Sequence, residues 1–386
     1  MTNDYRKKKM YLFLMVLTIT ATAGLQVWRT LFDNFAVNVI GLEGQHIGVI
    51  QSIREIPGFL ALLVVYVMLI LKENRISSLS IIVLGIGVMA GGFFPSYPGL
   101  IFTTLVMSFG FHYYETTNQS LTLQYFDEKT APIVFGRLRS FAAAANIVVG
   151  IVIFAAAPYL TYKMIFLLAG ILIVGVSLWS FTIYPENETV PKQRKRMILR
   201  KRYWLFYFLT LMAGARRQIF IAFAVFLLVK KFEFSLQEIA ILFLINNIIN
   251  YFLSPYIGRA IVKFGERKVL SLEYFSLIFI FMAYAFVDSK WLIAFLYIAD
   301  HIFFNFAISI RTFFQKIADP KDIAPSMAVG FTINHIAAVI FPVIGGLLWI
   351  IDYKIPFYCG AGFSLISLIA VQFITGQLKQ NSNSPD

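Results

Sequence analysis

The 386-residue chain is 59% hydrophobic and only 14% charged, with a mean hydropathy of +0.75. Because a soluble globular domain is about half apolar, this composition excludes a soluble protein and indicates a polytopic membrane protein. The net charge of +13 could suggest a nucleic-acid partner, but basic loops that face an anionic inner leaflet explain it better. The one cysteine, Cys359, excludes an intramolecular disulfide and any CxxC site.

Twelve apolar segments follow one another along the chain, and each can supply the ~20 residues that a helix needs to cross a bilayer. The basic stretch before the first segment is followed by no small-residue cleavage site, so we predict an uncleaved first span. A polar break divides the segments into six and six. The predicted spans are 11–37, 46–71, 77–95, 97–123, 137–158, 160–183, 203–229, 237–261, 269–287, 291–314, 326–350 and 355–377.

Lysine and arginine are distributed unevenly between the two sides of these spans. With the N-terminus inside, the inner flanks hold 22 of them and the outer flanks hold 5, and six arginines lie within spans. This bias identifies the basic side as cytoplasmic. We therefore predict, in a bacterial cytoplasmic (inner) membrane, a cytoplasmic tail at 1–10, six-helix bundles at 11–184 and 203–377, a cytoplasmic basic linker at 185–202 and a cytoplasmic tail at 378–386.

The two halves of the sequence resemble one another. Residues 41–58 (GLEGQHIGVIQSIREIPG) align with residues 234–250 (FSLQEIAILFLINNIIN) at an offset of 192. Residues 127–132 (DEKTAP) align with residues 319–325 (DPKDIAP) at an offset of 193. Two nearly equal offsets indicate duplication of a six-helix unit, and parallel repeats of this kind build one class of secondary transporter.

Between the predicted eighth and ninth spans the sequence reads GRAIVKFGERK, from Gly258 to Lys268. Together with the duplicated six-span halves and the basic linker, this loop resembles the major facilitator superfamily, whose loop motif is G-x-x-x-D-R-x-G-R-R/K-R/K. Gly258, Gly265, Arg267 and Lys268 match the motif, Lys263 stands where arginine is usual, and a valine replaces the acid. The resemblance implies an all-α membrane protein of twelve transmembrane helices in two pseudo-symmetric bundles, acting as a monomer, with a gating loop that has lost its acid. We expect the two glycines to serve a tight turn and close helix packing.

Ionisable side chains within the predicted spans mark candidate functional sites, because charges inside a membrane are costly. In the fold that the sequence resembles, spans 1, 4, 7 and 10 line a central cavity, spans 2, 5, 8 and 11 flank it, and spans 3, 6, 9 and 12 face lipid. The mid-span charges follow this division, with Glu273 assigned to the end of span 9. They are Arg29, Asp33, Arg54, Glu55, His112, Glu115, Arg139, Arg216, Arg217, Asp300, His301, Arg311 and His335.

Glu115 is the first candidate for a proton-coupling group, because a carboxylate in a low-dielectric cavity can bind and release protons near neutral pH. Asp300 is its rival, and His112 and His301 are candidates for a proton relay. The alternative for Glu115 is a structural ion pair with an arginine such as Arg29 or Arg54.

Arg216 and Arg217 lie at the centre of the seventh span, and arginine offers a planar fork for a carboxylate or phosphate. Six arginines against four acids leave two surplus positive charges in the spans, which favours an anionic substrate. The alternative is that these arginines connect the two halves through Asp300 and Glu115. Further substrate-binding candidates are Arg29, Arg54, Glu55, Gln119, Asn246, Asn247 and His335.

The histidines His112, His301 and His335 have no ligand spacing on one helix and no thiol beside them, so we predict no metal site. We also predict no cofactor. Within the chain no GxxxxGK[ST] loop occurs, which argues against ATP as the energy source. The acids are dispersed rather than clustered, so the sequence does not favour a membrane-embedded enzyme.

The leading prediction is a proton-coupled secondary active transporter of a small organic solute, working by alternating access, with organic anions or carboxylated metabolites favoured. One alternative is a proton-driven exporter of amphipathic drugs, which the aromatic content of 17% would suit. A less favoured alternative is a transport fold used as a sensor or assembly factor. The predicted partners are the solute, protons and the lipid bilayer, and no nucleic acid.

Overall fold

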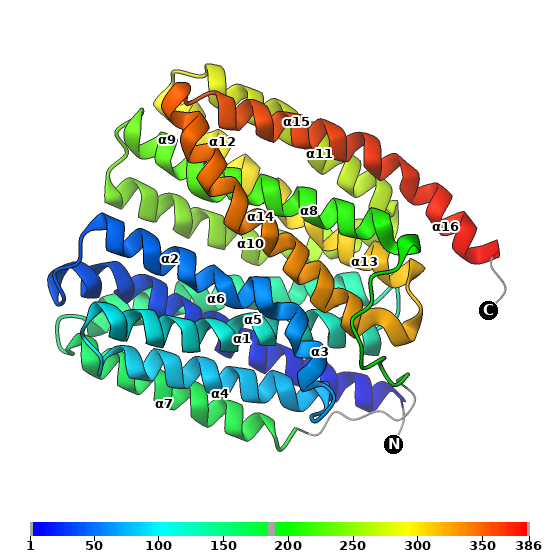
Figure 1. Cartoon of the computed structure of the whole chain (residues 1–386), viewed down its shortest axis with the longest axis horizontal. Helices are drawn as coiled ribbons and strands as arrows, with labels where there is room; N and C mark the ends of the chain where they lie inside the picture. The colour runs from blue at the N-terminus through cyan, green and yellow to red at the C-terminus, as the bar shows by residue number, and fades with distance from the viewer. Residues whose placement is uncertain (1–2, 184–189, 384–386) are drawn as a thin grey trace. The chain divides into compact units, whose positions relative to one another are not determined.

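The computed structural model describes residues 3–183 and 190–383, which form long helices (Figure 1). Eleven of the described helices are long and apolar enough to cross a membrane. α5 (Tyr97–Tyr125) is not among them, although its 29 residues exceed the ~20 that a crossing requires. Its second half carries the polar residues of the stretch HYYETTNQ, which lower its hydropathy. With α5 included, the all-α architecture of twelve membrane helices is confirmed.

The chain forms two compact units. Unit 1 comprises Met1–Phe126, Leu138–Ile198 and Lys321–Thr332, and unit 2 comprises Asp127–Arg137, Leu199–Pro320 and Ile333–Asp386. Unit 1 therefore includes the beginning of α14, and unit 2 includes the beginning of α6. Of the predicted tails, first bundle and linker, residues 1–2, 184–189 and 384–386 lie outside the described residues.

In unit 1, α4 packs between α5 and α7, while α2 packs on α5 and α1 packs on α7. The predicted second span continues through Pro57, which lies inside α2, and changes to a 3-10 turn at Leu60. The helices are α1 (Asn3–Asn38), α2 (Gly44–Phe59), η1 (Leu60–Leu63), α3 (Val64–Val67), α4 (Glu73–Gly91), α5, α6 (Ala131–Ala156) and α7 (Tyr162–Ser180).

Glycines bring α4 and α5 unusually close. A Cβ at Gly87 would lie 2.3 Å from the backbone nitrogen of Met107, and a Cβ at Gly110 would lie 2.3 Å from the backbone nitrogen of Leu84. Small residues at such an interface let two backbones approach within a membrane. The contact fixes the orientation of the polar second half of α5 within unit 1.

In unit 2, α11 packs against α15 and α12, α15 packs against α8, and α10 packs against α12. The helices are η2 (Lys201–Tyr203), α8 (Trp204–Gln218), η3 (Ile219–Ala224), α9 (Val225–Lys230), α10 (Leu236–Phe264), α11 (Glu266–Phe286), α12 (Lys290–Phe304), η4 (Asn305–Ala307), α13 (Ile308–Ile317), η5 (Pro320–Asp322), α14 (Ile323–Ile351), α15 (Ile355–Ala370), η6 (Val371–Phe373) and α16 (Ile374–Asn383).

Two membrane-crossing segments of unit 2 depart from α-helical geometry. The predicted seventh span is α8, a π-helical turn η3 and α9, and the predicted tenth span is α12, a 3-10 turn η4 and α13. Short π segments occur frequently at functional sites. Both departures adjoin the buried charged groups described below.

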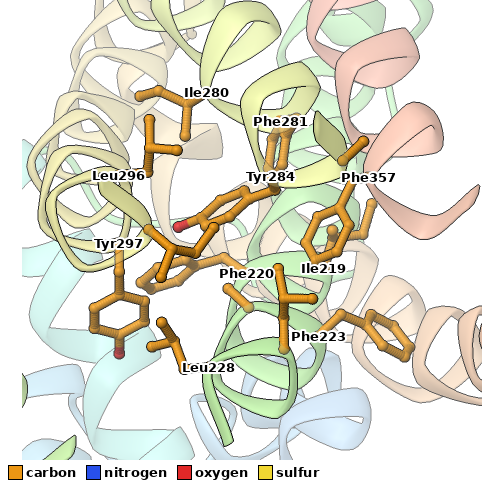
Figure 2. Close-up of a cluster of buried hydrophobic side chains, with 14 of the residues drawn as sticks. Ile219, Phe220, Phe223, Leu228, Ile280, Phe281, Tyr284, Leu296, Tyr297 and Phe357 are labelled. Atoms are coloured by element: carbon orange, nitrogen blue, oxygen red, sulfur yellow. The ribbon is translucent and has the colours of Figure 1, made fainter. Parts of the chain in front are cut away.

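A large apolar core holds the helices of unit 2 together, and Figure 2 shows its central side chains. Phe220 of η3 stacks on Tyr297 of α12 with ring centroids 5.0 Å apart, and Tyr284 of α11 lies against Phe357 of α15 at 5.1 Å. Such aromatic pairs contribute about 0.5–1.5 kcal/mol each beyond the area that they bury. The core therefore fixes the positions of η3, α11, α12 and α15 around the charged groups.

The loop motif joins α10 to α11. Gly265 has a φ of 81°, a left-handed conformation that suits glycine, and a Cβ at Gly258 would lie 2.4 Å from the carbonyl oxygen of Pro132. The two glycines thus occupy a turn and a close helix contact. The basic side chains Lys263, Arg267 and Lys268 are exposed, and whether they gate transport remains a prediction.

Candidate functional site

A polar stripe on α5 is joined to α2 within unit 1. The stripe consists of Ser108, His112, Glu115 and Gln119. Ser108 Oγ donates a hydrogen bond to the backbone carbonyl of Arg54 at 2.5 Å, and His112 Nδ1 lies 2.9 Å from Ser108 Oγ. Glu115 accepts a hydrogen bond from Gln119 Nε2 at 3.3 Å. His112 and Gln119 are buried and Glu115 is half-buried.

Arg54 pairs with its own neighbour in sequence. Its Nη2 atom lies 2.7 Å from Glu55 Oε1, and its guanidinium lies 5.5 Å from the ring of Trp28. Both members of the ion pair are 20% exposed. In the described structure the hydrogen-bond partner of Glu115 is therefore Gln119, not Arg54. Arg29 is exposed on α1.

Arg216 is the most deeply buried of the candidate arginines, at 3% exposure. Its Nη1 atom donates to Ser367 Oγ of α15, its Nη2 atom lies 3.6 Å from Glu273 Oε1 of α11, and its guanidinium lies 4.3 Å from the ring of Tyr274. The sequence had suggested Asp300 or Glu115 as partners of the central arginines. For Arg216 the observed partner is Glu273, within the same unit.

The position assigned to Glu273 from sequence is wrong. It was placed at the end of a lipid-facing span, but it lies two turns into α11 and is only 2% exposed. The physical reason is the rotation of the helix about its axis. A helix in the lipid-facing class still buries one side against its own bundle, and Glu273 lies on that side.

Asp300 of α12 completes a group that we name the charged triad: Arg216, Glu273 and Asp300. All three line a small cavity of about 10 Å³, measured as space for the centre of a water molecule, which is about what one water needs. Its other lining residues are apolar: Ala213, Phe220, Leu277, Phe281, Phe304 and Ala307. Phe220 and Phe281 belong to the core in Figure 2.

Each member of the charged triad has a buried polar atom without a hydrogen-bond partner among the described residues. These atoms are Arg216 Nη2, Glu273 Oε2 and Asp300 Oδ2. Buried polar groups in folded proteins are nearly always hydrogen-bonded, so three such atoms in one place require a water, an ion or a bound proton as partner.

Arg217 differs from its neighbour. It is half-buried, its Nε atom is buried, and within the described part of the chain that atom has no hydrogen-bond partner and the guanidinium has no acid within ion-pair distance. Successive helical residues point about 100° apart, so Arg217 does not share the Glu273 contact of Arg216.

A polar network links α10 to the α12–η4 junction. Asn250 Nδ2 lies 2.7 Å from His301 Nε2, and Asn305 Nδ2 donates to Asn250 Oδ1 at 2.5 Å. On the same helix Asn246 is 2% exposed, and neither atom of its amide has a partner among the described residues. Asn247, by contrast, donates to the carbonyl of Phe243. His301 therefore belongs to a hydrogen-bond network that was not predicted from the sequence.

His335 is buried on α14 at 3% exposure. In its neighbourhood along the helix, Asn334 Nδ2 donates to the carbonyl of Thr210 of α8 at 3.1 Å. His335 remains a candidate for substrate binding.

Sequence analysis missed two carboxylates that begin equivalent helices. Glu73 begins α4 and accepts from Gln124 of α5 at 2.7 Å, while Glu266 begins α11 and lies 2.8 Å from Lys316 Nζ of α13. The repeat offsets could have revealed them, because 193 takes residue 73 to 266 and 192 takes residue 124 to 316. These pairs fix the start of one helix against the next in each half.

Solved structures share this fold over almost their whole length. A bacterial homologue of the iron transporter ferroportin in an outward-facing state has a TM-score of 0.79 at 13% identity, covering 95% of this chain and 99% of that one. The human organic anion transporter MFSD10 (TETRAN) has 0.74 at 10%, covering 95% and 99%. The transporter FucP in the outward conformation has 0.71 at 12%, covering 94% and 98%. At these identities the likeness shows the fold alone.

No curated protein was found to match the sequence. The family model described as Major Facilitator Superfamily matches residues 10–324 and, separately, residues 206–385. The two overlapping matches cover nearly the whole chain, and the matched family consists of transporters of small molecules rather than enzymes. This multi-pass membrane protein therefore belongs to the Major Facilitator Superfamily.

Proposed function

We propose that the protein is a secondary active transporter of small organic anions or carboxylated metabolites, working by alternating access and coupled to protons. The substrate class is inferred from Arg217. It is a half-buried arginine in a membrane-crossing segment without an acidic partner in the described structure.

An arginine in this position needs an anion. Its guanidinium stays charged at any physiological pH, so it cannot relieve the cost of burial by losing a proton. Arg216, one residue earlier, meets the same need with Glu273. A carboxylate on the solute would supply the missing counter-ion for Arg217 and would form two parallel hydrogen bonds with its planar fork.

A further group of the same unit could complete recognition of the solute. Asn246 offers an amide with both atoms free of partners in the described structure. Among the proteins that share the fold, one is an organic anion transporter and another is the E. coli fucose:proton symporter. These names make organic anions and proton coupling reasonable first classes to assay.

We also propose that the protein is a monomer in the bacterial cytoplasmic membrane, with both termini in the cytoplasm. The 22-to-5 distribution of basic residues supports this orientation. A cysteine-accessibility assay on an engineered site near residue 379 would test the orientation. Labelling from the cytoplasmic side is expected.

The test is transport in proteoliposomes that contain a pH-sensitive dye, with a panel of labelled organic anions, neutral sugars and cationic drugs. We expect anions alone to be taken up with proton movement, and Arg217→Ala to raise KM for the anion about 10- to 100-fold, the effect of losing a charged hydrogen bond. Arg217→Lys should recover only part of this loss because a lysine lacks the planar fork. The matched control is Arg137→Ala, which removes an exposed arginine.

The alternative outcomes are distinct. Uptake or efflux of cationic drugs that Arg217→Ala leaves unchanged would favour the amphipathic exporter. Transport of anions without proton movement would remove coupling to protons while retaining the substrate class. Silence with every solute would favour a sensor or assembly role and would contradict the proposal.

A further inference from the structure

We propose that Asp300 carries the coupled proton and that the Arg216–Glu273 pair keeps a second charge from forming beside it. The inference rests on the proposed function for its biological role. Of the two acidic candidates it selects Asp300, and it adds Glu273, which the sequence had placed at the end of a lipid-facing span.

The charged triad holds more acidic than basic groups. Two carboxylates and one guanidinium are each 2–3% exposed and face one cavity. With both acids ionised the site would hold one unbalanced negative charge away from water, which is strongly unfavourable. Binding one proton removes that imbalance, so the site has room for one proton and one water.

The geometry indicates which acid holds the proton. Glu273 lies 3.6 Å from Arg216 Nη2, so its negative charge is balanced. Asp300 forms no ion pair in the described structure, and its Oδ2 atom has no hydrogen-bond partner there. A neutral carboxyl group is therefore favoured at Asp300 and an ionised one at Glu273.

Other groups face Asp300 without adding a counter-charge. From α11 come Glu273 and Tyr284, and α12 itself contributes Tyr297, while His301 is the next residue along the chain. The imidazole of His301 is held by Asn250 of α10, which is uncharged. Arg216 from α8 is thus the one permanent cation that the described residues bring to this cavity.

A proton suits the site better than a metal cation. Hard cations such as Ca²⁺ take six to eight oxygen ligands, whereas this cavity offers two carboxylates and a largely apolar wall. The guanidinium of Arg216 would also repel a second cation. About one water fits, which is enough to pass a proton but too little to hydrate an ion.

Glu115 lacks these features. It is half-buried and accepts a hydrogen bond from Gln119. The acid and the arginine that lie near the same His112, Glu55 and Arg54, form an ion pair with each other and are each 20% exposed. An ionised Glu115 is therefore less costly than an ionised Asp300, which is 2% exposed. The coupled proton is therefore assigned to Asp300 of the charged triad and not to Glu115.

The test uses infrared difference spectra of the purified full-length protein in nanodiscs as the pH is varied in H₂O and in D₂O. A protonated buried carboxyl group gives a C=O band that shifts in D₂O, and this band needs no knowledge of the solute. We expect the wild type to show one such band, Asp300→Asn to lose it and Glu115→Gln to keep it. In Glu273→Gln, Asp300 is the only acid left beside Arg216. The band should therefore titrate at a pH at least one unit lower than in the wild type, which is at least a ten-fold change in proton affinity.

Several results would overturn the assignment: a band that persists in Asp300→Asn, a band lost in Glu115→Gln, no band in the wild type, or no displacement of its titration in Glu273→Gln. A band or unfolding temperature that changes when NaCl replaces KCl at equal ionic strength would identify a sodium site instead. Glu273→Gln retains Asp300 and decides the matter should Asp300→Asn not fold.

A transport assay distinguishes an error in this proton site from an error in the proposed function. Proton flux that survives in Asp300→Asn would remove Asp300 from coupling and leave the transporter intact. The expected infrared band without solute-driven flux would support the proton site and contradict the proposed coupling.

Discussion

The carboxylate of Glu266, the first residue of α11, lies 2.8 Å from Nζ of Lys316 on α13. At the equivalent place in the first half, Glu73 begins α4 and accepts instead from the neutral amide of Gln124. The duplicated halves have kept the acid and changed its partner. The two contacts can therefore be compared by exchanging partners between the halves.

Lys316→Met should destabilise the protein, because it leaves the carboxylate of Glu266, which is 2% exposed, without its cation. Breaking a buried ion pair costs about 3 kcal/mol or more. We expect a lower midpoint of thermal unfolding in detergent. Gln124→Lys, which copies the second half into the first, should not lower it. An unchanged midpoint for Lys316→Met would show that the pair contributes little.

Gly110→Ala should separate α4 from α5. The added Cβ would lie 2.3 Å from the backbone nitrogen of Leu84 and 2.4 Å from the carbonyl oxygen of Ser80, and neither backbone atom can move alone. Overpacking of this kind costs about 1–3 kcal/mol. Gly175→Ala on α7 is the matched control, since nothing lies within 4 Å of a Cβ there and alanine favours helix. Equal thermal stability of the two variants would disprove the close contact.

Asp322→Asn should release the basic linker. Asp322 is fully buried and pairs with Arg194, and the backbone nitrogen of Arg194 also donates to the carbonyl of Lys321 at 2.8 Å. The substitution leaves every tryptic site of the linker in place, so faster trypsin cleavage at 192–196 would report opening alone. A loss of about 1.4 kcal/mol would raise the rate about ten-fold when opening is at equilibrium. The exposed-acid control Asp352→Asn should cleave at the wild-type rate.

The contact of Lys231 with Asp288 predicts a defined pH range. Its hydrogen bond at 2.8 Å and the charge of Lys231 lower the pKa of Asp288. Burial acts to lower the pKa of Lys231, but the hydrogen bonds to Asp288 and Tyr353 outweigh it and leave the pKa raised.

The contribution of this pair to stability is therefore complete above the unfolded pKa of aspartate, about 3.9, and below that of lysine, about 10.4. It is lost as pH falls through the folded pKa of Asp288 or rises through that of Lys231. We expect Asp288→Asn to lower the unfolding midpoint slightly between these limits and to match the wild type outside them. Because Asp288 is 84% exposed, added salt should shrink the difference, and a difference that salt leaves unchanged would argue against this pair.

Much of the fold could be predicted from the sequence because membrane helices are specified by length and hydropathy. The polar stretch of α5 was recognised as part of a span even though its composition alone does not reach that of the other helices. The repeat offsets also placed Arg54-Glu55 on Asn246-Asn247, and both pairs lie on corresponding helices, α2 and α10.

The partners of charged residues could not be predicted in the same way. Whether Glu273 faces lipid or the interior depends on the rotation of α11 about its axis, and hydropathy does not encode that rotation when the whole helix is apolar. The network of Asn250, His301 and Asn305 likewise depends on where η4 ends α12. Such contacts follow from packing, which a single sequence specifies only indirectly.

The π-helical turn Ile219–Ala224 breaks the phase of the segment that contains the two central arginines. A helical wheel drawn from Trp204 to Lys230 with 3.6 residues per turn is valid only as far as Gln218, and a second wheel begins at Val225. One residue removed from the turn would restore a continuous α-helix, and the residues after it would keep nearly the same orientation relative to Arg216 and Arg217, because a π turn holds one residue more than an α turn. In any comparison of related sequences, a single-residue gap at this point would therefore mark loss of the π turn, while the later side chains of the span would still face the same way.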